Sequence, residues 1–332
     1  MSTSIEREQS KRLMVFAGRS SRALGERIAD KLDIELGDAT LKTFANGEIY
    51  CRFEESVRGA DVFLVQSTCR PVNDSLMELL IMINAAHLAS ADRVTAVIPW
   101  YGYSRQDKKS APREPITAKL VADLLMAAQV DRVLTMDMHA GQIQGFFRIP
   151  VDHMTAVPLL ADHFLDRFHY SGDRDQDLVV VSPDAGRAKL ANHVAEKLGA
   201  NLAVLTKQRP DHNRAEITLL IGDVRGRTAI LVDDMIDTAG TLCAGAEAVM
   251  DGGATRVFAA ATHGIFSGRA FERLADSVIE EVVVTDTIPL GDGAPSDLVR
   301  VLSVDSILAN SVRNVFSDES VSEIFAGENQ LF

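Results

Sequence analysis

The residues with the most evident chemistry lie in one short segment, DDMIDTAGT at 233–241. It follows an apolar run and leads into an amphipathic stretch, which predicts a strand end, a loop of small residues and a helix N-terminus. Backbone N–H groups and the helix dipole bind anions at such a point, and the hydroxyls of Thr238 and Thr241 add donors. Asp233 and Asp234 suit sugar hydroxyls, which donate hydrogen bonds to carboxylates. The segment therefore predicts a site for a phosphorylated sugar, with an Asp-capped strand-turn-helix as the plain alternative.

A polyphosphate would need further cations, because the chain has neither GxxxxGK[ST] nor a GxGxxG that follows a predicted strand. Residues 105–114 carry four Lys and Arg against two acidic residues. Lys207 and Arg209 follow a predicted strand and could stabilise a transferring phosphoryl group from a loop. His139 comes just after another apolar run. From the residues alone, each feature has a plain alternative. Residues 105–114 could be a solvated loop, Lys207 and Arg209 could belong to a charged surface turn, and His139 could be a structural histidine.

Composition bounds the class of protein. A chain of 332 residues predicts two domains at about 150 residues each. Hydrophobic residues at 46% and charged residues at 24% exclude a disordered chain. The net charge of −13 argues against a nucleic-acid binder, and no apolar run reaches the roughly 18 residues of a membrane span. A polar N-terminus, without the apolar core of a signal peptide, and three cysteines without a CxxC pair favour reduced thiols and a cytoplasmic location.

Short Val/Ile/Leu-rich runs alternate with amphipathic stretches, which predicts parallel α/β structure. The helical stretches are 73–90, opening on Asn-Asp cap chemistry, 117–128, and 241–251, which ends at a Gly-Gly stop signal. A faint repeat relates 132–140 to 256–264, shifted by 124 residues, and favours two similar domains. The predicted strands are 13–17, 61–66, 93–98, 132–136, 178–182, 202–206, 229–232, 256–261 and 281–285.

The segment DDMIDTAGT resembles the phosphoribosyl-binding motif that type I phosphoribosyltransferases share with ribose-phosphate pyrophosphokinases. Other segments resemble the second family and follow its order from about residue 13 to residue 326, so the similarity covers nearly the whole chain. These segments are TFANGE at 43–48, YGYSRQD at 101–107, DMHA at 137–140, QIQGFF at 142–147, VSPD at 181–184, KQRP at 207–210 and THGIFSG at 262–268. The chain is thus similar to the ribose-phosphate pyrophosphokinase family.

This resemblance implies an α/β fold of two similar domains, each a parallel sheet flanked by helices, as in type I phosphoribosyltransferases. Residues 1–157 would form the ATP side and 158–304 the phosphoribosyl side, with helices in 305–332 packing back on the first domain. The implied enzyme, a transferase of nucleotide biosynthesis, moves the β,γ-diphosphoryl group of ATP to the anomeric hydroxyl of D-ribose 5-phosphate. Its products are 5-phospho-α-D-ribose 1-diphosphate and AMP. The alternatives are a type I phosphoribosyltransferase and a non-catalytic regulatory paralogue.

The resemblance also implies roles for individual residues. Lys207 and Arg209 would be catalytic, and His139 and Asp184 would bind one or two magnesium ions. Asp184 and Asp233 are both candidates for a general base. The residues implied to bind ATP are Phe44, Asn46, Gly47, Glu48, Arg105, Gln106, Asp107 and His139. Those implied to bind ribose 5-phosphate are Arg209, Asp233, Asp234, Asp237, Thr238, Ala239, Gly240 and Thr241.

Regulation and assembly are implied in the same way. Inorganic phosphate is the expected activator, ADP the expected inhibitor, and the expected assembly is a homo-oligomer, a hexamer in the family. The regulatory residues would be Arg58, Lys108, Lys109, Arg113, Ser320 and Phe325. Two positions depart from the family pattern: Arg187 follows Gly186 where many members have a second glycine, and Gln208 stands in place of a basic residue.

Overall fold

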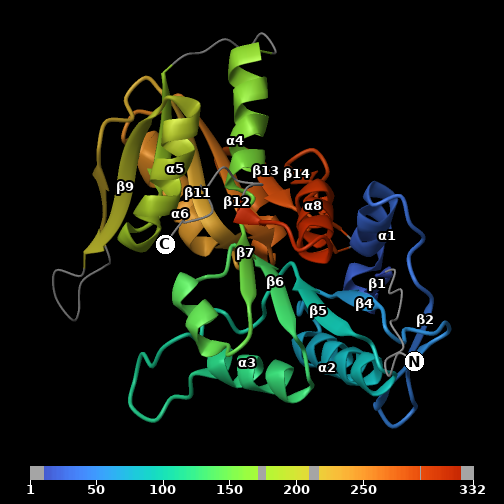
Figure 1. The fold of residues 1–332 in the computed structure, drawn as a ribbon. Helices are drawn as coiled ribbons and strands as arrows, with labels where there is room; N and C mark the ends of the chain where they lie inside the picture. The colour runs from blue at the N-terminus through green and yellow to red at the C-terminus, as the bar shows by residue number, and fades with distance from the viewer. Residues whose placement is uncertain (1–10, 171–176, 209–216, 292, 323–332) are drawn as a thin grey trace, which may run out of the picture. The chain divides into compact units, whose positions relative to one another are not determined.

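The computed structural model describes residues 11–170, 177–208, 217–291 and 293–322. The chain folds into two compact units (Figure 1). Unit 1 comprises Met1–Thr135, Gln142–Asp152 and Asp305–Ile324, and unit 2 comprises Met136–Gly141, His153–Val304 and Phe325–Phe332. Each unit is built on an open sheet flanked by helices, as the sequence predicts.

Unit 1 contains a sheet in the order β1-β4-β5-β6-β7, and its first four strands are parallel. Its strands are β1 (Leu13–Ala17), β4 (Asp61–Val65), β5 (Arg93–Ile98), β6 (Arg132–Met136) and β7 (Val151–Met154). A separate antiparallel hairpin is formed by β2 (Ala39–Thr43) and β3 (Ile49–Phe53). The helices are α1 (Arg22–Lys31), α2 (Val72–Leu88), α3 (Thr117–Ala127) and α8 (Asp305–Phe316), with short turns η1 (Arg19–Ser21) and η2 (Gly141–Phe146).

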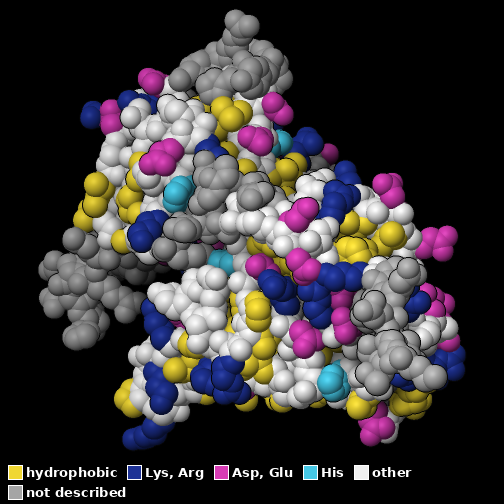
Figure 2. Space-filling model, viewed as in Figure 1, with side chains coloured by type: hydrophobic (Ala, Val, Ile, Leu, Met, Phe, Trp, Pro, Cys, Tyr) yellow, Lys and Arg dark blue, Asp and Glu magenta, His cyan; other side chains and the backbone are white. Residues whose placement is uncertain are grey.

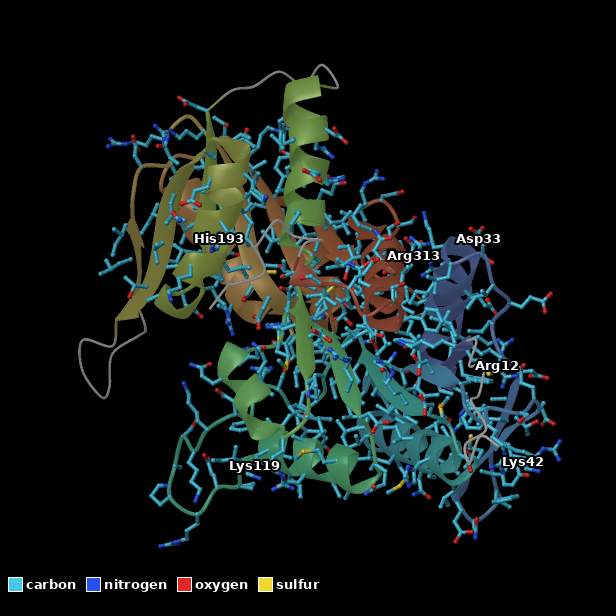
Figure 3. All side chains as sticks on the ribbon, viewed as in Figure 1. Arg12, Asp33, Lys42, Lys119, His193 and Arg313 are labelled. Atoms are coloured by element: carbon cyan, nitrogen blue, oxygen red, sulfur yellow. The ribbon has the colours of Figure 1, made fainter. Side chains whose placement is uncertain are left out.

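The last helix packs on the first helix of the chain within unit 1. Arg313 of α8, labelled in Figure 3, donates a hydrogen bond of 3.0 Å to the carbonyl of Lys31 at the end of α1. Arg27 of α1 lies 3.8 Å from Asp305, the first residue of α8. The C-terminal segment therefore completes the unit that begins with the N-terminal strand.

Unit 2 contains a seven-stranded sheet in the order β10-β9-β8-β11-β12-β13-β14, parallel except that β10 runs antiparallel to β9. Its strands are β8 (Leu178–Ser182), β9 (Asn201–Gln208), β10 (Ile217–Ile221), β11 (Thr228–Ile236), β12 (Arg256–Gly264), β13 (Ile279–Thr285) and β14 (Val299–Leu302). Its helices are α4 (Val157–Leu165), α5 (Ala188–Leu198), α6 (Gly240–Asp251) and α7 (Ala270–Ala275), with short turns η3 (Asp166–Tyr170) and η4 (Ala185–Arg187).

The strands of unit 2 are apolar without alternation because helices cover both faces of the sheet. In β8, Leu178 and Val180 pack in a core cluster with residues of α4 and α5. Val179 and Val181 point the other way and pack in a second cluster with residues of α6 and α7. Full burial of each such side chain contributes about 1.5–3 kcal/mol relative to leaving it in water.

All nine predicted strands are present, and the repeat is visible in the structure. The starts of α3 and β6 are matched, to within one residue, by the starts of α6 and β12 about 124 residues later. Helix α6 ends at Asp251 and Gly253 has a φ of 97°, so the predicted glycine stop is confirmed. The prediction of an Asn-Asp cap was wrong: α2 begins at Val72, the capping position is Pro71, and Asn73 lies inside the helix.

The predicted strand at 229–232 is longer than expected. Strand β11 continues to Ile236 because β12 pairs with it as far as Gly264, so Asp233 and Asp234 lie within the strand rather than after it. All three cysteines are free thiols, as predicted. No helix in the described part of the chain has both the length and the apolar character that a membrane crossing requires. Acidic and basic side chains lie next to one another over much of the visible surface (Figure 2).

A buried carboxylate in β13 is contacted by two arginines and a histidine. Glu281 is 7% exposed and accepts hydrogen bonds from Arg167 and, at 2.9 Å, from Arg300. His163 Nε2 lies 3.8 Å from the same carboxylate. Burial alone would raise the pKa of Glu281, but the contacts with His163 and Arg300 and the charge of Arg167 outweigh it and lower that pKa to about 2.

We predict that Glu281→Gln lowers the free energy of unfolding at pH 7 by about 2 kcal/mol, since Arg167 and Arg300 lose their buried counter-charge, and the partial exposure of both arginines limits the loss. The unfolded-state pKa is about 4.3, so the wild-type contribution is complete above that value and is lost as the pH falls toward 2. Urea unfolding at pH 7 and pH 3 measures both effects. The matched control is Glu280→Gln, an exposed neighbour; an equal loss there would remove the cluster from the explanation.

Candidate active site

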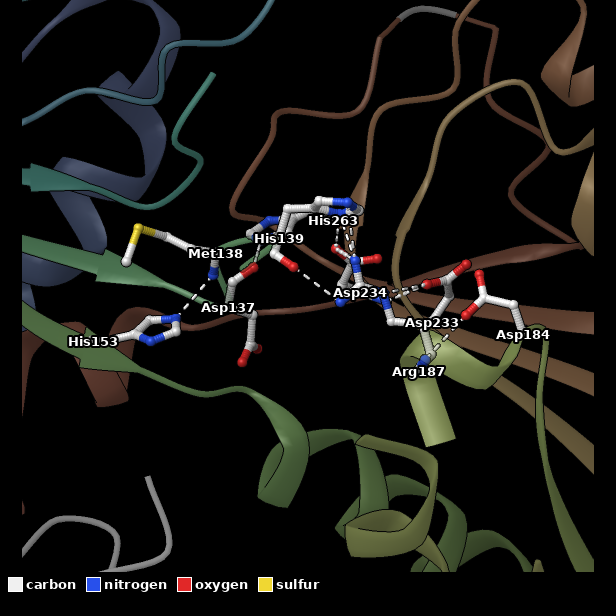
Figure 4. A network of polar contacts seen from close by, with 9 residues as sticks. All are labelled: Asp137, Met138, His139, His153, Asp184, Arg187, Asp233, Asp234 and His263. Atoms are coloured by element: carbon white, nitrogen blue, oxygen red, sulfur yellow. Dashed lines mark hydrogen bonds and ion pairs between the residues drawn. The ribbon is translucent and has the colours of Figure 1, made fainter. Parts of the chain in front are cut away.

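The polar residues of unit 2 gather where three neighbouring parallel strands end. Asp233 and Asp234 lie in β11, Asp184 follows β8 on one side, and His263 lies in β12 on the other. His139 comes from the segment Met136–Gly141, which belongs to the same unit. Figure 4 shows these side chains converging. Ligands of open α/β sheets bind at this carboxyl edge.

Arg187 lies at the centre of the cluster, and its side chain is only 14% exposed. Its Nη1 donates to the His139 carbonyl at 2.9 Å, and its Nη2 lies 2.5 Å from His139 Nδ1. The same Nη2 lies 3.1 Å from Asp234 Oδ2, and Nε lies 3.6 Å from Asp233 Oδ1. One guanidinium therefore contacts the imidazole and both carboxylates (Figure 4).

The two adjacent carboxylates have different protonation properties. Burial, together with the neighbouring Asp234, raises the pKa of Asp233. Burial would also raise the pKa of Asp234, but the contacts with His139 and Asp233 and the charge of Arg187 lower it to about 2. The Asp234 N–H donates to Asp233 Oδ1 at 2.8 Å, which fixes the first carboxylate relative to the strand. Asp234 is thus the permanent anion of the pair.

A buried polar network below the cluster holds the segment that carries His139. Asp137 Oδ2 accepts hydrogen bonds from the Ala156 N–H at 2.8 Å and from the Thr262 hydroxyl at 2.6 Å. Asp137 Oδ1 is buried without a hydrogen-bond partner, and the residue has a φ of 33°. Burial raises the pKa of Asp137 to about 6. Such an unpaired buried oxygen on a strained backbone is typical of functional segments.

Two buried histidines hold the peptide group between Asp137 and Met138. Because a carbonyl only accepts, His263 Nε2 must donate to the Asp137 carbonyl at 3.1 Å, and Nδ1 then accepts from the Thr287 hydroxyl at 2.9 Å. His153 Nε2 accepts the Met138 N–H at 2.8 Å. Burial lowers the pKa of both histidines to about 4, so both are neutral at physiological pH and have a defined tautomer.

The loop at 237–239 is anchored through its carbonyl groups. The Asp237 carbonyl accepts the Ser267 N–H at 2.9 Å, and the Thr238 carbonyl accepts Arg273 Nη1 at 2.6 Å. Ala239, with a φ of 59°, is the residue immediately before α6. The first N–H groups of a helix have no acceptor in their own helix, so this loop presents donors at the N-terminus of α6. The predicted loop and helix start are therefore present, with the helix beginning one residue earlier than expected, and phosphate binding there stays a prediction.

The residues expected on the ATP side lie in unit 1, except His139, which belongs to unit 2. Phe44 is 45% exposed next to the turn between β2 and β3, so it is not a core residue. The turn is closed by hydrogen bonds of 2.8 Å from the Phe44 N–H to the Glu48 carbonyl and from the Gly47 N–H to the Phe44 carbonyl. Asn46 Oδ1 accepts the Glu48 N–H at 3.2 Å, and Gly47 has a φ of 93°.

The second segment of the ATP side precedes α3. Arg105 and Gln106 are exposed and Asp107 is half-buried. The Gln106 side chain accepts the Thr117 hydroxyl at 2.5 Å, and the Gln106 carbonyl accepts the Ala118 N–H at 3.1 Å. These bonds attach the segment to the first turn of α3.

Three further predicted residues lie in or next to segments outside the described part of the chain. The backbone of Lys207 lies in β9, paired with Thr218, whereas Arg209 and Phe325 lie outside the described residues. The cations of the expected regulatory set are exposed side chains of unit 1, and one of them, Arg58, donates to the Ser90 hydroxyl at 3.2 Å. The exposed members are Arg58, Lys108, Lys109, Arg113 and Ser320.

The expected metal ligands are both close to Arg187 but do not form a ready-made metal centre. Asp184 Oδ1 accepts the Arg187 N–H at 3.0 Å, so this carboxylate caps η4. Within the described ranges, no three His, Cys, Asp or Glu side chains are grouped so as to hold a metal ion. The donor chemistry fits magnesium only if nucleotide and water oxygens complete the coordination.

The sequence did not single out Arg187 or Arg273 as site residues. Arg187 was evident only as a departure from a glycine pair, and Arg273 lies 35 residues from the carbonyl that it contacts. Neither position carries a local motif. His263 was evident from the repeat, at the position that corresponds to His139, and from the segment THGIFSG, but it was given no role.

The carboxylate pair, the anchored small-residue loop and the parallel sheets define an α/β protein of the type I phosphoribosyltransferase-like fold. Two family models match the chain: the N-terminal domain of ribose phosphate pyrophosphokinase over residues 13–128, and the phosphoribosyl synthetase-associated domain over residues 205–326.

Curated relatives match over nearly the whole length. The ribose-phosphate pyrophosphokinase of Caldanaerobacter subterraneus is 53% identical, covering 94% of this chain and 98% of its own. That of Fusobacterium nucleatum is 50% identical, covering 94% and 97%. The crystal structure of phosphoribosylpyrophosphate synthetase from Mycobacterium smegmatis is 47% identical with a TM-score of 0.87, and covers 93% of this chain and 100% of its own. The chain belongs to the ribose-phosphate pyrophosphokinase family, and it is a transferase.

Proposed function

We propose that the chain transfers the β,γ-diphosphoryl group of ATP to the anomeric hydroxyl of D-ribose 5-phosphate. The products are 5-phospho-α-D-ribose 1-diphosphate and AMP. The observation that carries this proposal is the near full-length match to ribose-phosphate pyrophosphokinases, combined with the carboxylate pair and anchored loop of unit 2. A phosphoribosyltransferase would leave the match at residues 13–128 unexplained. A regulatory paralogue would not need Lys207, Arg209 and the carboxylate pair together.

The geometry of unit 2 supports separate binding positions for the 5-phosphate and for the hydroxyls of the sugar. The N–H groups at the start of α6 and the hydroxyls of Thr238 and Thr241 hold the 5-phosphate. Asp233 and Asp234 accept hydrogen bonds from the 2- and 3-hydroxyls of the ribose. This arrangement positions the anomeric oxygen, and positioning is a large part of the barrier reduction in phosphoryl transfer.

The chemical step is an in-line displacement at the β-phosphorus of ATP. The anomeric oxygen forms a bond to the β-phosphorus while the bond from that phosphorus to the oxygen bridging to the α-phosphorus breaks, and AMP leaves with the electron pair. The proton of the anomeric hydroxyl passes to a base, for which Asp184 and Asp233 are the candidates. Lys207 and Arg209 stabilise the charge that develops on the β-phosphate.

The ATP side is assigned to unit 1. Phe44 offers an exposed ring on which adenine can stack, and the turn that carries Asn46, Gly47 and Glu48 faces the ribose of ATP. Arg105, Gln106 and Asp107 bind the nucleotide, with the guanidinium of Arg105 on its phosphates. Magnesium, held by His139 and Asp184 together with nucleotide oxygens, supplies Lewis-acid neutralisation of the polyphosphate charge.

We assign unit 1, including 305–322, to ATP and unit 2 to ribose 5-phosphate. These units differ from the predicted domains 1–157 and 158–304, because Met136–Gly141 and residues 153–157 belong to unit 2. We place the protein in the cytoplasm as a homo-oligomer, a hexamer, without nucleic-acid or membrane partners. Size-exclusion chromatography with light scattering tests the assembly, and a monomer at micromolar concentration would contradict it.

The reaction is tested by incubating the pure chain with ATP, ribose 5-phosphate and MgCl₂ and measuring AMP. We predict that Lys207→Ala lowers turnover by about two to three orders of magnitude, because one transition-state donor contributes roughly 3–4 kcal/mol. Lys197→Ala, on α5, is the matched control and keeps wild-type turnover. Near-normal turnover of Lys207→Ala would remove this lysine from the mechanism, and absence of AMP from the wild-type chain would contradict the proposed function.

Substitutions in the loop separate the two substrates. We predict that Asp237→Ala and Thr241→Ala raise the KM for ribose 5-phosphate by about tenfold or more, since each loses a polar contact at the 5-phosphate loop, and leave the KM for ATP within about twofold. Steady-state kinetics with each substrate varied provides the measurement. An effect confined to ATP would place the wrong ligand in this loop.

Regulation is the remaining part of the proposal. Arg58, Lys108, Lys109 and Arg113 are exposed cations, and, with Ser320 and Phe325, they would bind inorganic phosphate as activator and ADP as inhibitor between subunits. An anion relieves repulsion among cations that converge from different subunits. We predict that Arg58→Ala raises the phosphate concentration for half-activation several-fold and changes basal turnover little. ADP that competes only with ATP in both proteins, with an intact phosphate response in the variant, would exclude such a site.

A further inference from the structure

Arg187 is held in the carboxylate cluster by contacts from its backbone and its side chain. The backbone N–H donates to Asp184 Oδ1 at 3.0 Å, and Nη1 donates to the His139 carbonyl at 2.9 Å. With 14% of its side chain exposed, the guanidinium is largely removed from water. These anchors place a permanent positive charge at a fixed position, since arginine stays protonated in proteins.

The atoms that face the guanidinium are of the kinds that bind metal ions. His139 Nδ1 and Asp234 Oδ2 lie 2.8 Å apart, and both lie within 3.1 Å of Arg187 Nη2. Nη2 can only donate and the Asp234 carboxylate can only accept, so the tautomer of His139 decides which of the two contacts of Nδ1 is a hydrogen bond. In either case an imidazole nitrogen and a carboxylate oxygen lie against one cation, and that cation is part of the chain.

A divalent ion cannot share this position with Arg187. Magnesium binds oxygen at about 2.0–2.1 Å, so an ion bound to both Asp234 Oδ2 and His139 Nδ1 would lie close to Nη2. Two positive centres a few ångströms apart repel strongly where little water screens them. The ion would bind there only if Arg187 released His139, Asp233 and Asp234 together.

We propose that Arg187 is the resident cation of the ribose-binding carboxylates, so that Asp233 and Asp234 hold the sugar hydroxyls without a divalent ion of their own. The proposal rests on the proposed function for the identity of the sugar, and it makes Arg187 a positioning residue. The guanidinium neutralises the carboxylate pair, orients Asp234, and leaves carboxylate oxygens for the hydroxyls to bind. Magnesium would then enter the site with the nucleotide.

The test is binding of Mn²⁺ to the full chain without nucleotide or sugar, followed by electron paramagnetic resonance. Wild type is expected to bind Mn²⁺ weakly at this position. Arg187→Gln, which removes the charge but keeps a donor, is expected to gain one Mn²⁺ per chain with a Kd at least tenfold lower than that of wild type. Arg187→Lys keeps a cation and is expected to behave as wild type. Arg225→Gln is the matched control, because Arg225 is 82% exposed and contacts Asp223.

The position of the gained ion is checked in the double variant Arg187→Gln/Asp234→Asn. Loss of the extra Mn²⁺ in this variant supports the proposal, whereas its retention would show that the ion lies elsewhere and overturn it. Equal Mn²⁺ affinity in wild type, Arg187→Gln and Arg225→Gln would overturn it as well.

A measurement on wild type keeps the proposal testable if Arg187→Gln does not fold. Without nucleotide, MnCl₂ is expected to leave the Tm of wild type unchanged. A stabilisation that saturates at one ion per chain and disappears in Asp234→Asn would contradict the resident-cation role. Mn²⁺ binding does not depend on turnover, so absence of AMP in the activity assay would refute the proposed function without affecting this result.

Discussion

The burial of Asp234 is the constraint on which the site depends. Its side chain is 7% exposed near the carboxyl end of β11, the central strand of a seven-stranded sheet. An ionised carboxylate in such a place is costly without a partner. Arg187 and His139 supply the partners, and their own positions are then fixed in turn. Asp184 holds the backbone of Arg187, and the buried network around Asp137 holds the segment that ends in His139. The need to stabilise the Asp234 carboxylate thus accounts for the positions of Arg187 and His139.

The same constraint is met differently elsewhere in unit 2. Glu281 is also buried, but its partners are two arginines and a histidine that are partly exposed to water. No strained backbone residue accompanies it in its strand. The cluster around Asp234, in contrast, lies next to Asp137 and Ala239, which both have positive φ values. Strain of this kind persists where function requires a particular backbone position.

The fold was predictable to the extent that burial leaves a pattern in the sequence. Central strands such as β8 are covered on both faces, so their apolar runs are unmistakable. The edge strand β14 and the hairpin β2–β3 are partly exposed, and their mixed composition gave no signal. The predicted strand at 229–232 ends before Asp233 because two adjacent aspartates are typical of a loop. In the structure, pairing with β12 extends β11 through both aspartates. The loop at 237–241 was predictable because its chemistry is local, whereas Arg187 acts through contacts to residues 46 to 48 positions away.

Rigidity of the phosphate loop follows from the way its carbonyls are used. Ile236, Asp237 and Thr238 each have a carbonyl that accepts a hydrogen bond from residues 265–267 or from Arg273. With these acceptors occupied on one side, the peptide groups cannot rotate to satisfy the N–H groups internally. The N–H groups at the start of α6 therefore keep a fixed orientation, so an anion that binds as proposed would require little reorganisation. The left-handed conformation of Ala239, unfavourable by about 1–2 kcal/mol for a residue with a side chain, is maintained by the same anchors. Arg273 thus stabilises, from 35 residues away, the backbone that presents these donors.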